Sequence, residues 1–273
     1  MNEEFTMEKI QELEFDLLKF LKSVCQKYNL NYFLAYGTLI GVARHQDFIP
    51  WDDDVDVMIP REDYHKLIKA IEKESHPYYK IISYETNQDF TVPLPKLVDT
   101  RTKLVQKYDI VEKVELGIYI DLFIIDGVGD SLEKGYQYYD ESLELYKLWK
   151  KSALNLFPPK RSKLFGIMRW LKNIYYKCRG NKYYIEKIQE HNSKYSFYQS
   201  EYVATLETGT GDSKKCVWPH SYFGKGTNLK IKDEYFNVPD CYDLVLESEY
   251  GDYMQLPPLE ARKSHHSYSL EWS

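Results

Sequence analysis

The chain has 273 residues, a formal net charge of −6, 43% hydrophobic and 29% charged residues, which is the composition of a folded protein with one large or two modest domains. The segment MNEEFTMEKI has no secretory-signal pattern, and no apolar run approaches the ~18 residues of a membrane span. The four cysteines are scattered without a CxxC pair, which indicates reduced thiols and predicts a cytoplasmic protein.

Hydrophobic periodicity predicts a series of elements along the chain. Helices are expected at 7–29, 37–45 and 61–73, and strands at 32–36, 54–59, 79–84, 93–100 and 116–127. Strands and helices alternate early, which favours an α/β or α+β fold with a mixed sheet core flanked by helices. We therefore predict a catalytic core at 1–130, a mainly helical insertion, basic and aromatic-rich, at 131–195, and a C-terminal segment at 196–273 that completes the core and the substrate site.

The stretch IPWDDDVDVMIP (49–60) places four aspartates at the start of a predicted strand. Side chains alternate across a strand, so Asp54 and Asp56 are expected on one face and the valines beside them on the other. Two carboxylates on one face suit a hard divalent cation such as Mg²⁺. A calcium-binding loop would need glycine where Val57 stands, and a solvated acidic turn explains the first aspartates but not Asp56 between valines.

Asp121, Gly37 and Thr38 suggest the same chemistry. Asp121 lies within the apolar run GIYIDLFIID, where a charge needs either a salt-bridge partner or a metal. Asp126, beside Gly127, is expected to be a turn residue. Gly37 and Thr38 open a predicted helix directly after a strand, and a helix N-terminus offers free N–H groups and the positive end of a dipole to phosphate.

Four segments resemble the LicD family of phosphotransferases, which also covers the fukutin-related proteins: YGTLIGVARHQDFIPWDDDVDVMIPREDY (36–64), PKLVDTRT (95–102), GIYIDLFIIDG (117–127) and GDYMQLPP (251–258). The resemblance implies a nucleotidyltransferase-like fold. It also implies transfer of phosphocholine, or of a related phospho-alcohol, from a CDP-linked donor to a glycan hydroxyl during synthesis of a cell-surface polysaccharide or teichoic acid. The insertion at 131–195 matches no motif of the family.

The resemblance implies roles for particular residues. The expected catalytic and metal-binding carboxylates, which would hold Mg²⁺ or Mn²⁺, are Asp54, Asp56 and Asp121. The residues expected to contact the phosphates of the substrate are Gly37, Thr38, Arg44 and Lys96. Arg44 and Lys96 could instead be ordinary surface charges. CDP-choline is the preferred donor, because aromatic faces hold a quaternary ammonium and several aromatics lie beside the family motifs: Trp51, Tyr119, Tyr250 and Tyr253.

Two other functions remain open from the sequence. A glycosyltransferase can use a DxD motif and a divalent cation on a nucleotide sugar. A non-catalytic nucleotide-binding member of the family would have no need of all three carboxylates. Release of CMP or of UDP from CDP-choline and UDP-sugars separates these functions from phosphocholine transfer.

The insertion contains a strongly basic segment. Residues 160–182 hold eight Lys/Arg and no acid, so the rest of the chain carries −14, the difference between −6 and +8. Apolar residues recur there at helical spacing, which predicts a basic amphipathic helix. The helix either packs on the body or contacts an anionic membrane surface or a polyanionic, lipid-linked acceptor; membrane contact would place the protein at the inner face of the membrane. The acidic remainder argues against nucleic acid as a partner.

Overall fold

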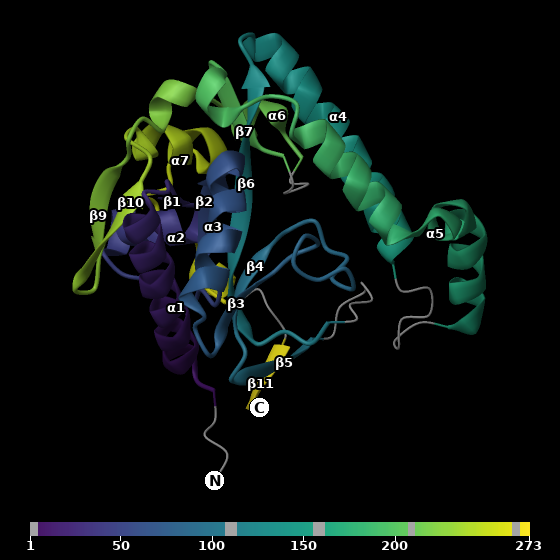
Figure 1. Ribbon diagram of the computed structural model, residues 1–273, viewed down its shortest axis with the longest axis horizontal. Coiled ribbons are helices and arrows are strands. Elements are labelled where there is room, and N and C mark those ends of the chain that lie inside the picture. The colour runs from purple at the N-terminus through teal and green to yellow at the C-terminus, as the bar shows by residue number, and fades with distance from the viewer. Residues whose placement is uncertain (1–4, 107–113, 155–161, 207–210, 264–267) are drawn as a thin grey trace.

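The computed structural model describes residues 5–106, 114–154, 162–206, 211–263 and 268–273. Its centre is a mixed sheet with strand order β1-β2-β6-β4-β3, extended by β7, which pairs with β6, and by β8, which pairs with β7 (Figure 1). The strands of this sheet are β1 (Phe33–Leu34), β2 (Asp56–Pro60), β3 (Tyr79–Ile82), β4 (Lys96–Asp99), β6 (Ile118–Gly129), β7 (Tyr202–Thr205) and β8 (Val217–Pro219). The mixed α/β fold expected from the sequence is confirmed.

Strand β6 organises the sheet. It runs parallel to β2 and antiparallel to β4 and β7. On one face Ile120, Leu122 and Ile124 are buried in the largest core cluster, together with residues of helices α1 (Met7–Tyr28) and α3 (Arg61–Glu74). The other face of β6 carries Asp121 in the first half of the strand and Ile125, in a second core cluster, further along.

The prediction for the end of β6 is wrong. Asp126 was expected in a turn, but it lies inside the strand opposite Ala204 of β7 and is completely buried. Its two carboxylate oxygens accept hydrogen bonds from Nε and Nη2 of Arg61, both at 2.6 Å. The pairing with β7, about eighty residues later in the chain, carries the strand beyond Asp126, and the Arg61 guanidinium compensates the buried charge.

Two helices near the N-terminus frame the sheet. Thr6 caps α1 by accepting a hydrogen bond from the Lys9 amide at 3.2 Å, and Asn29 ends it with φ 52°. The predicted helix at 37–45 is α2 (Tyr36–Ile40) followed by a π-helical turn (Gly41–His45).

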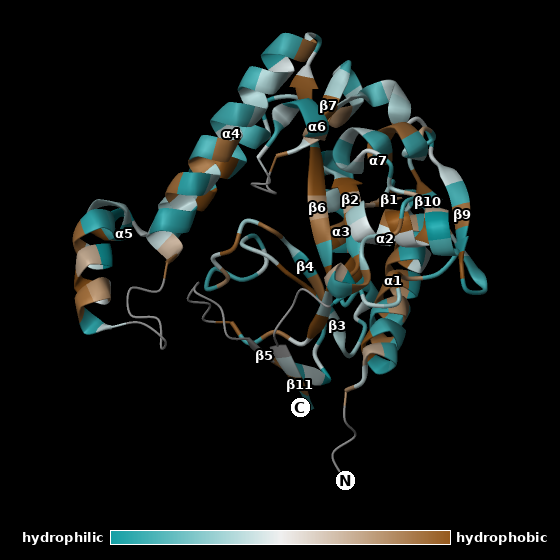
Figure 2. Ribbon diagram, turned by 180° about the vertical axis from the view of Figure 1, so that it is seen from behind, coloured by the Kyte–Doolittle hydropathy of each residue, from teal (hydrophilic) through white to brown (hydrophobic). Residues whose placement is uncertain are grey.

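The described residues of the insertion are mainly helical, as the sequence predicts. It contains α4 (Leu132–Ala153) and α5 (Lys163–Asn192), and α5 bends sharply at Gly180, where φ is 78° and ψ is 157°. The second half of α5 packs against α4 through a small cluster around Trp149, Ile185 and Ile188. Figures 1 and 2 show both helices leading away from the sheet, with the first half of α5 at the far end.

The C-terminal part of the chain completes several contacts. Helices α6 (Ser213–Cys216) and α7 (Tyr242–Tyr250) lie near β8, and β9 (Thr227–Ile231) pairs with β10 (Glu234–Val238) as a hairpin. Short 3₁₀ turns occur at Phe197–Gln199, His220–Tyr222 and Leu259–Ala261. Strand β11 (Tyr268–Trp272) pairs with β5 (Thr102–Gln106). The division of the chain at 130 and 195 stays a prediction.

Candidate active site

One row of the sheet gathers three of the predicted residues. Asp56 of β2 lies opposite Asp121 of β6, and Lys96 of β4 lies opposite the same Asp121. Paired residues of neighbouring strands project from the same face. Lys96 Nζ lies 2.5 Å from Asp121 Oδ1, and these side chains are only 8% and 14% exposed. The salt bridge considered as an alternative for Asp121 therefore exists within the candidate site itself.

A loop of aspartates lies next to this row. The carboxylates of Asp52, Asp53 and Asp54 each place an oxygen within 4.8 Å of the others. The Gln11 amide of α1 holds the loop by donating to the carbonyl oxygens of Ile49, at 3.1 Å, and Asp52, at 2.8 Å. Asp53 is buried, at 5% exposure, so the solvated turn that the sequence allowed does not describe it. Helix α1 thus fixes the backbone of the acidic loop.

The structure adds a carboxyl group that the sequence analysis missed. Glu14 of α1 is 2% exposed, and its Oε2 is buried without a hydrogen-bond partner among the described residues. Burial, followed by the charges of Asp54, Asp53 and Asp52, raises the pKa of Glu14 well above its usual value. A signal was present in the sequence, because Glu14 occupies a position of the helical stripe that is otherwise apolar.

Negative charge accumulates in the row as well. Asp56 is 8% exposed, and burial, then the charges of Asp54, Asp121 and Asp52, raises the pKa of its carboxyl well above the usual value, against the opposing effect of Lys96. One lysine does not neutralise this cluster. A site of this kind favours a multivalent cation with oxygen ligands.

The two residues expected at the helix start contact the aspartates directly. The Thr38 hydroxyl accepts a hydrogen bond from the Asp56 amide at 2.9 Å, so it fixes the start of β2. A Cβ on Gly37 would lie 2.6 Å from Asp52 Oδ2, so a larger residue here would displace the Asp52 carboxylate. Their role as phosphate ligands stays a prediction.

The two cationic candidates have protein partners. Arg44 Nη1 donates to the carbonyl oxygen of Tyr253 at 2.6 Å, and thereby ties the C-terminal motif at 251–258 to the α2 region. Burial, and then the charge of Arg262, lowers the pKa of Arg44. Lys96 Nζ lies 3.7 Å from the centroid of the Tyr119 ring, in addition to its contact with Asp121. Contact of either cation with substrate phosphate stays a prediction.

Two residues at the end of α7, Glu249 and Tyr250, have perturbed pKa values. The Tyr250 side chain is 48% exposed, yet desolvation of its hydroxyl, then the charges of Glu249 and of Asp56, raises the pKa of the phenol. Burial raises the pKa of Glu249 to about 8, and its Oε2 has no hydrogen-bond partner among the described residues. Tyr250 therefore lies within electrostatic range of Asp56.

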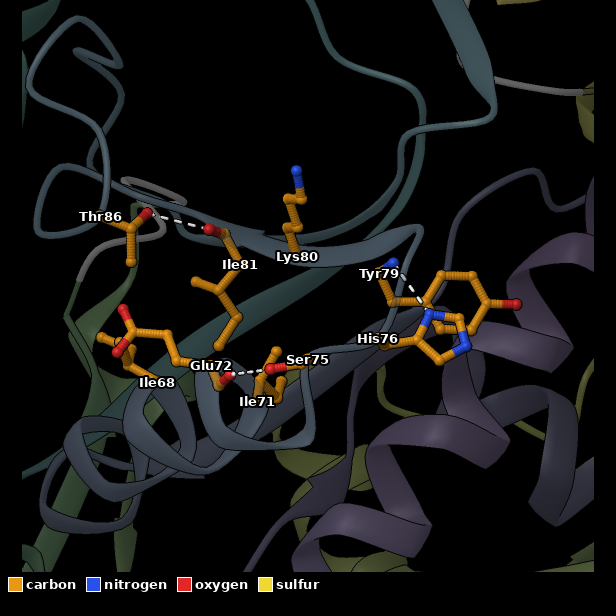
Figure 3. Close-up of a pocket in the computed structure, with 9 residues that line it drawn as sticks. All are labelled: Ile68, Ile71, Glu72, Ser75, His76, Tyr79, Lys80, Ile81 and Thr86. Carbon is orange, nitrogen blue, oxygen red and sulfur yellow. Dashed lines mark hydrogen bonds between the residues drawn. The ribbon is translucent and has the colours of Figure 1, made fainter.

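A pocket of about 290 Å³ lies elsewhere, between the end of α3 and β3 (Figure 3). His76 stacks on Tyr79 at its rim, with ring centroids 4.1 Å apart, and Nδ1 of His76 accepts from the Tyr79 amide at 3.1 Å. None of the predicted site residues lines this pocket. The carboxylate row, not this pocket, is the candidate active site.

Comparison with known proteins identifies the family of this chain. Residues 29–170 match the LicD/FKTN/FKRP nucleotidyltransferase domain. The chain is 30% identical, over 96% of both chains, to the lipopolysaccharide cholinephosphotransferase LicD of Haemophilus influenzae. The chain belongs to the LicD/FKTN/FKRP nucleotidyltransferase family. All seven predicted site residues fall inside the matched domain, whereas Glu14 and Tyr250 lie outside it.

Other relatives share shorter stretches with this chain. An uncharacterised protein of Rickettsia prowazekii is 26% identical over 53% of this chain and 49% of its own. The human ribitol 5-phosphate transferase FKRP is 44% identical over 45 residues, which is 16% of this chain and 9% of FKRP. The Haemophilus protein thus matches nearly the whole chain, and FKRP matches one short segment.

Proposed function

We propose that this protein transfers phosphocholine from CDP-choline to a hydroxyl group of a glycan in cell-surface polysaccharide synthesis. The observation that carries the proposal is the similarity to a lipopolysaccharide cholinephosphotransferase over 96% of both chains. The row of Asp56, Asp121 and Lys96 supports it, because carboxylates that hold a divalent cation would bring the positive charge that phosphoryl transfer from a highly charged donor requires. CDP-choline would be supplied in the cytoplasm, where the proposal places the protein.

We infer that Asp54, Asp56 and Asp121 hold Mg²⁺ or Mn²⁺. The donor set fits, because carboxylate oxygens are the ligands these ions prefer, and the raised pKa of Asp56 reflects negative charge that Lys96 alone does not offset. The bound metal would supply neutralisation of donor phosphate charge and acidification of the acceptor hydroxyl. Thr38 and the Gln11 amide keep the aspartates in place through their backbone contacts.

The chemical step proposed for these residues is a single displacement at phosphorus. The acceptor oxygen forms a bond to the phosphorus of the phosphocholine group, the bond from that phosphorus to the bridging oxygen breaks, and CMP leaves. Asp121 accepts the proton of the acceptor hydroxyl. Lys96 Nζ lies 2.5 Å from Asp121 Oδ1 and keeps this carboxylate in position. Backbone N–H groups at Gly37 and Thr38, near the start of α2, would contact the donor phosphate.

The aromatic residues suggest where choline would bind. Lys96 already covers Tyr119, and the guanidinium carbon of Arg262 lies 5.4 Å from the centroid of Trp51, so both rings already have a cation of the protein beside them. Tyr253 is nearly buried, at 9% exposure. Tyr250 combines a half-exposed ring with nearby carboxylates, a combination that attracts a quaternary ammonium. We therefore propose Tyr250 as a choline contact.

A donor competition tests the proposal. Limiting enzyme with Mg²⁺ is given CDP-choline together with CDP-glycerol, CDP-ribitol or a UDP-sugar, and the products are quantified. We expect the enzyme to use CDP-choline in preference to the other donors. This preference should fall at least tenfold in Tyr250→Ala. It should not fall in Tyr235→Ala, the control, which changes an exposed tyrosine of β10. Preference for CDP-ribitol, which the short match to FKRP makes the second candidate, would refute choline and retain phosphotransfer. UDP release would indicate a glycosyltransferase. Release of neither CMP nor UDP from any donor would indicate a non-catalytic protein.

A further inference from the structure

The first half of α5 presents its apolar residues to solvent instead of to the protein. This segment, residues 163–179, is called the α5 arm here; it ends where Gly180 bends the helix. Five large apolar side chains at helical spacing are between 50% and 67% exposed: Leu164, Ile167, Met168, Leu171 and Tyr175. The buried positions of the arm are instead Gly166 and Asn173, which are a small and a polar residue. Figure 2 shows hydrophobic residues on this arm at the end remote from the sheet.

The charges of the α5 arm select the kind of surface it contacts. The arm carries five Lys/Arg and no acid, in a chain whose net charge is −6. At about 100° per residue, Lys172 and Arg179 flank one edge of the apolar stripe and Lys163 flanks the other. A second copy of this acidic chain would supply negative charge. The apolar stripe between the basic residues also needs an apolar layer directly beneath that charge. An anionic bilayer has both properties.

The dimensions of the arm indicate how it contacts the bilayer. Seventeen helical residues extend about 25 Å, and the bend at Gly180 separates them from the half of α5 that packs on α4. Among the described residues, no helix is long and apolar enough to cross a membrane. The stripe therefore suits a helix that lies in the plane of the interface, with its leucines below the phosphates and its lysines among them.

We propose that the α5 arm is a membrane-docking helix that binds the surface of bilayers containing anionic lipids. Trp170, 41% exposed at the side of the stripe, would lie at the level of the headgroups. Docking would hold the protein at the surface on which a lipid-linked glycan acceptor is carried; this consequence rests on the proposed function, whereas the binding itself does not.

Vesicle sedimentation of the full chain tests this proposal without donor or acceptor. At low salt we expect at least tenfold more binding to vesicles of phosphatidylcholine with one quarter phosphatidylglycerol than to phosphatidylcholine alone, and weaker binding as salt rises. Leu171→Glu should lose at least tenfold of this binding. The matched control is Leu259→Glu, which changes a leucine that is 75% exposed in the C-terminal 3₁₀ turn and should bind as the wild type does.

Further arms of the experiment separate the apolar and ionic contributions. The double variant Lys163→Gln, Lys172→Gln should bind vesicles more weakly and with a smaller dependence on salt. Brominated lipids should quench the tryptophan fluorescence of the wild type, and this quenching should be lost in Trp170→Phe. Circular dichroism checks that each variant is folded. Failure of the wild type to bind anionic vesicles at low salt, or wild-type binding by Leu171→Glu, overturns the proposal. A dimer in sedimentation velocity that Leu171→Glu dissociates overturns it in favour of self-association. CMP release from CDP-choline is scored separately, so failure of docking and failure of the proposed reaction are distinct results.

Discussion

Replacing Asp56 with asparagine is expected to abolish transfer and yet to stabilise the metal-free protein. Asp56 is 8% exposed, and burial together with the charges of Asp54, Asp121 and Asp52 raises the pKa of its carboxyl well above the ordinary value. Asparagine has the same shape and no charge. The variant therefore folds without the desolvation and repulsion that the wild-type carboxylate meets in the sheet.

The size of the gain is bounded by the chemistry of one carboxyl group. Protonating an aspartic acid of ordinary pKa 3.8 at pH 7 costs about 4 kcal/mol, which is the most that the substitution can recover there. Lys96 opposes the shift, so we expect about 1–3 kcal/mol. Because the pKa is raised in the folded state, the wild type loses stability as pH rises above the ordinary pKa, and the advantage of the variant grows from about pH 4 upward.

Urea unfolding in EDTA at pH 7 measures this difference, and repetition with Mg²⁺ tests the metal site. Metal at a hundred times its dissociation constant should stabilise the wild type by about 2.7 kcal/mol and leave Asp56→Asn nearly unchanged. Asp140→Asn, which removes the same charge from an exposed position of α4, is the matched control and should change neither quantity. An Asp56→Asn variant that is less stable in EDTA, responds to Mg²⁺ as the wild type does, or retains transfer would refute the assignment of Asp56.

Three further changes test other parts of the structure. Arg61→Met should lower the free energy of unfolding by about 3–5 kcal/mol, because it leaves the Asp126 carboxylate buried and unpaired, and Asp126→Leu in the same chain should recover most of the loss in urea melts. Burial raises the pKa of Glu249 from 4.5 to about 8, so the wild type should lose stability as pH rises between these values, and Glu249→Gln should show a flatter pH profile of unfolding; parallel profiles would contradict the burial of Glu249. Gly37→Ala places a Cβ 2.6 Å from Asp52 Oδ2, so it should lower transfer at least tenfold while unfolding changes by only about 1 kcal/mol; an unchanged rate would count against the role of this close approach.

The sequence alone identified the local elements of the site. Apolar periodicity located α1, and alternation located the strands that contain Asp56 and Asp121, because a helix and a strand each bury one side with a period that is visible in the sequence. The charged residues inside apolar runs marked the site, since isolated buried charges are too costly to occur without partners. These inferences need only neighbouring residues.

Only the tertiary structure decided how those elements meet. The register that puts Asp56, Asp121 and Lys96 in one row joins strands that are 25 to 65 residues apart, and it depends on which strands become neighbours. The same holds for Arg61, which turns Asp126 from an expected turn residue into half of a buried ion pair. Partners that lie so far apart in the chain leave no local pattern by which to choose them.

The acidic cluster shows the same division. The sequence revealed four aspartates, but Glu14 from α1 and Tyr250 from α7 join them only in the folded chain. The amphipathic pattern of residues 163–179 was visible in the sequence. Whether its apolar face meets the protein or solvent was not, because periodicity defines an apolar face without saying what covers it. The fold buries Gly166 and Asn173 and leaves the leucines exposed, since the bend at Gly180 carries the arm away from the core that would otherwise cover them.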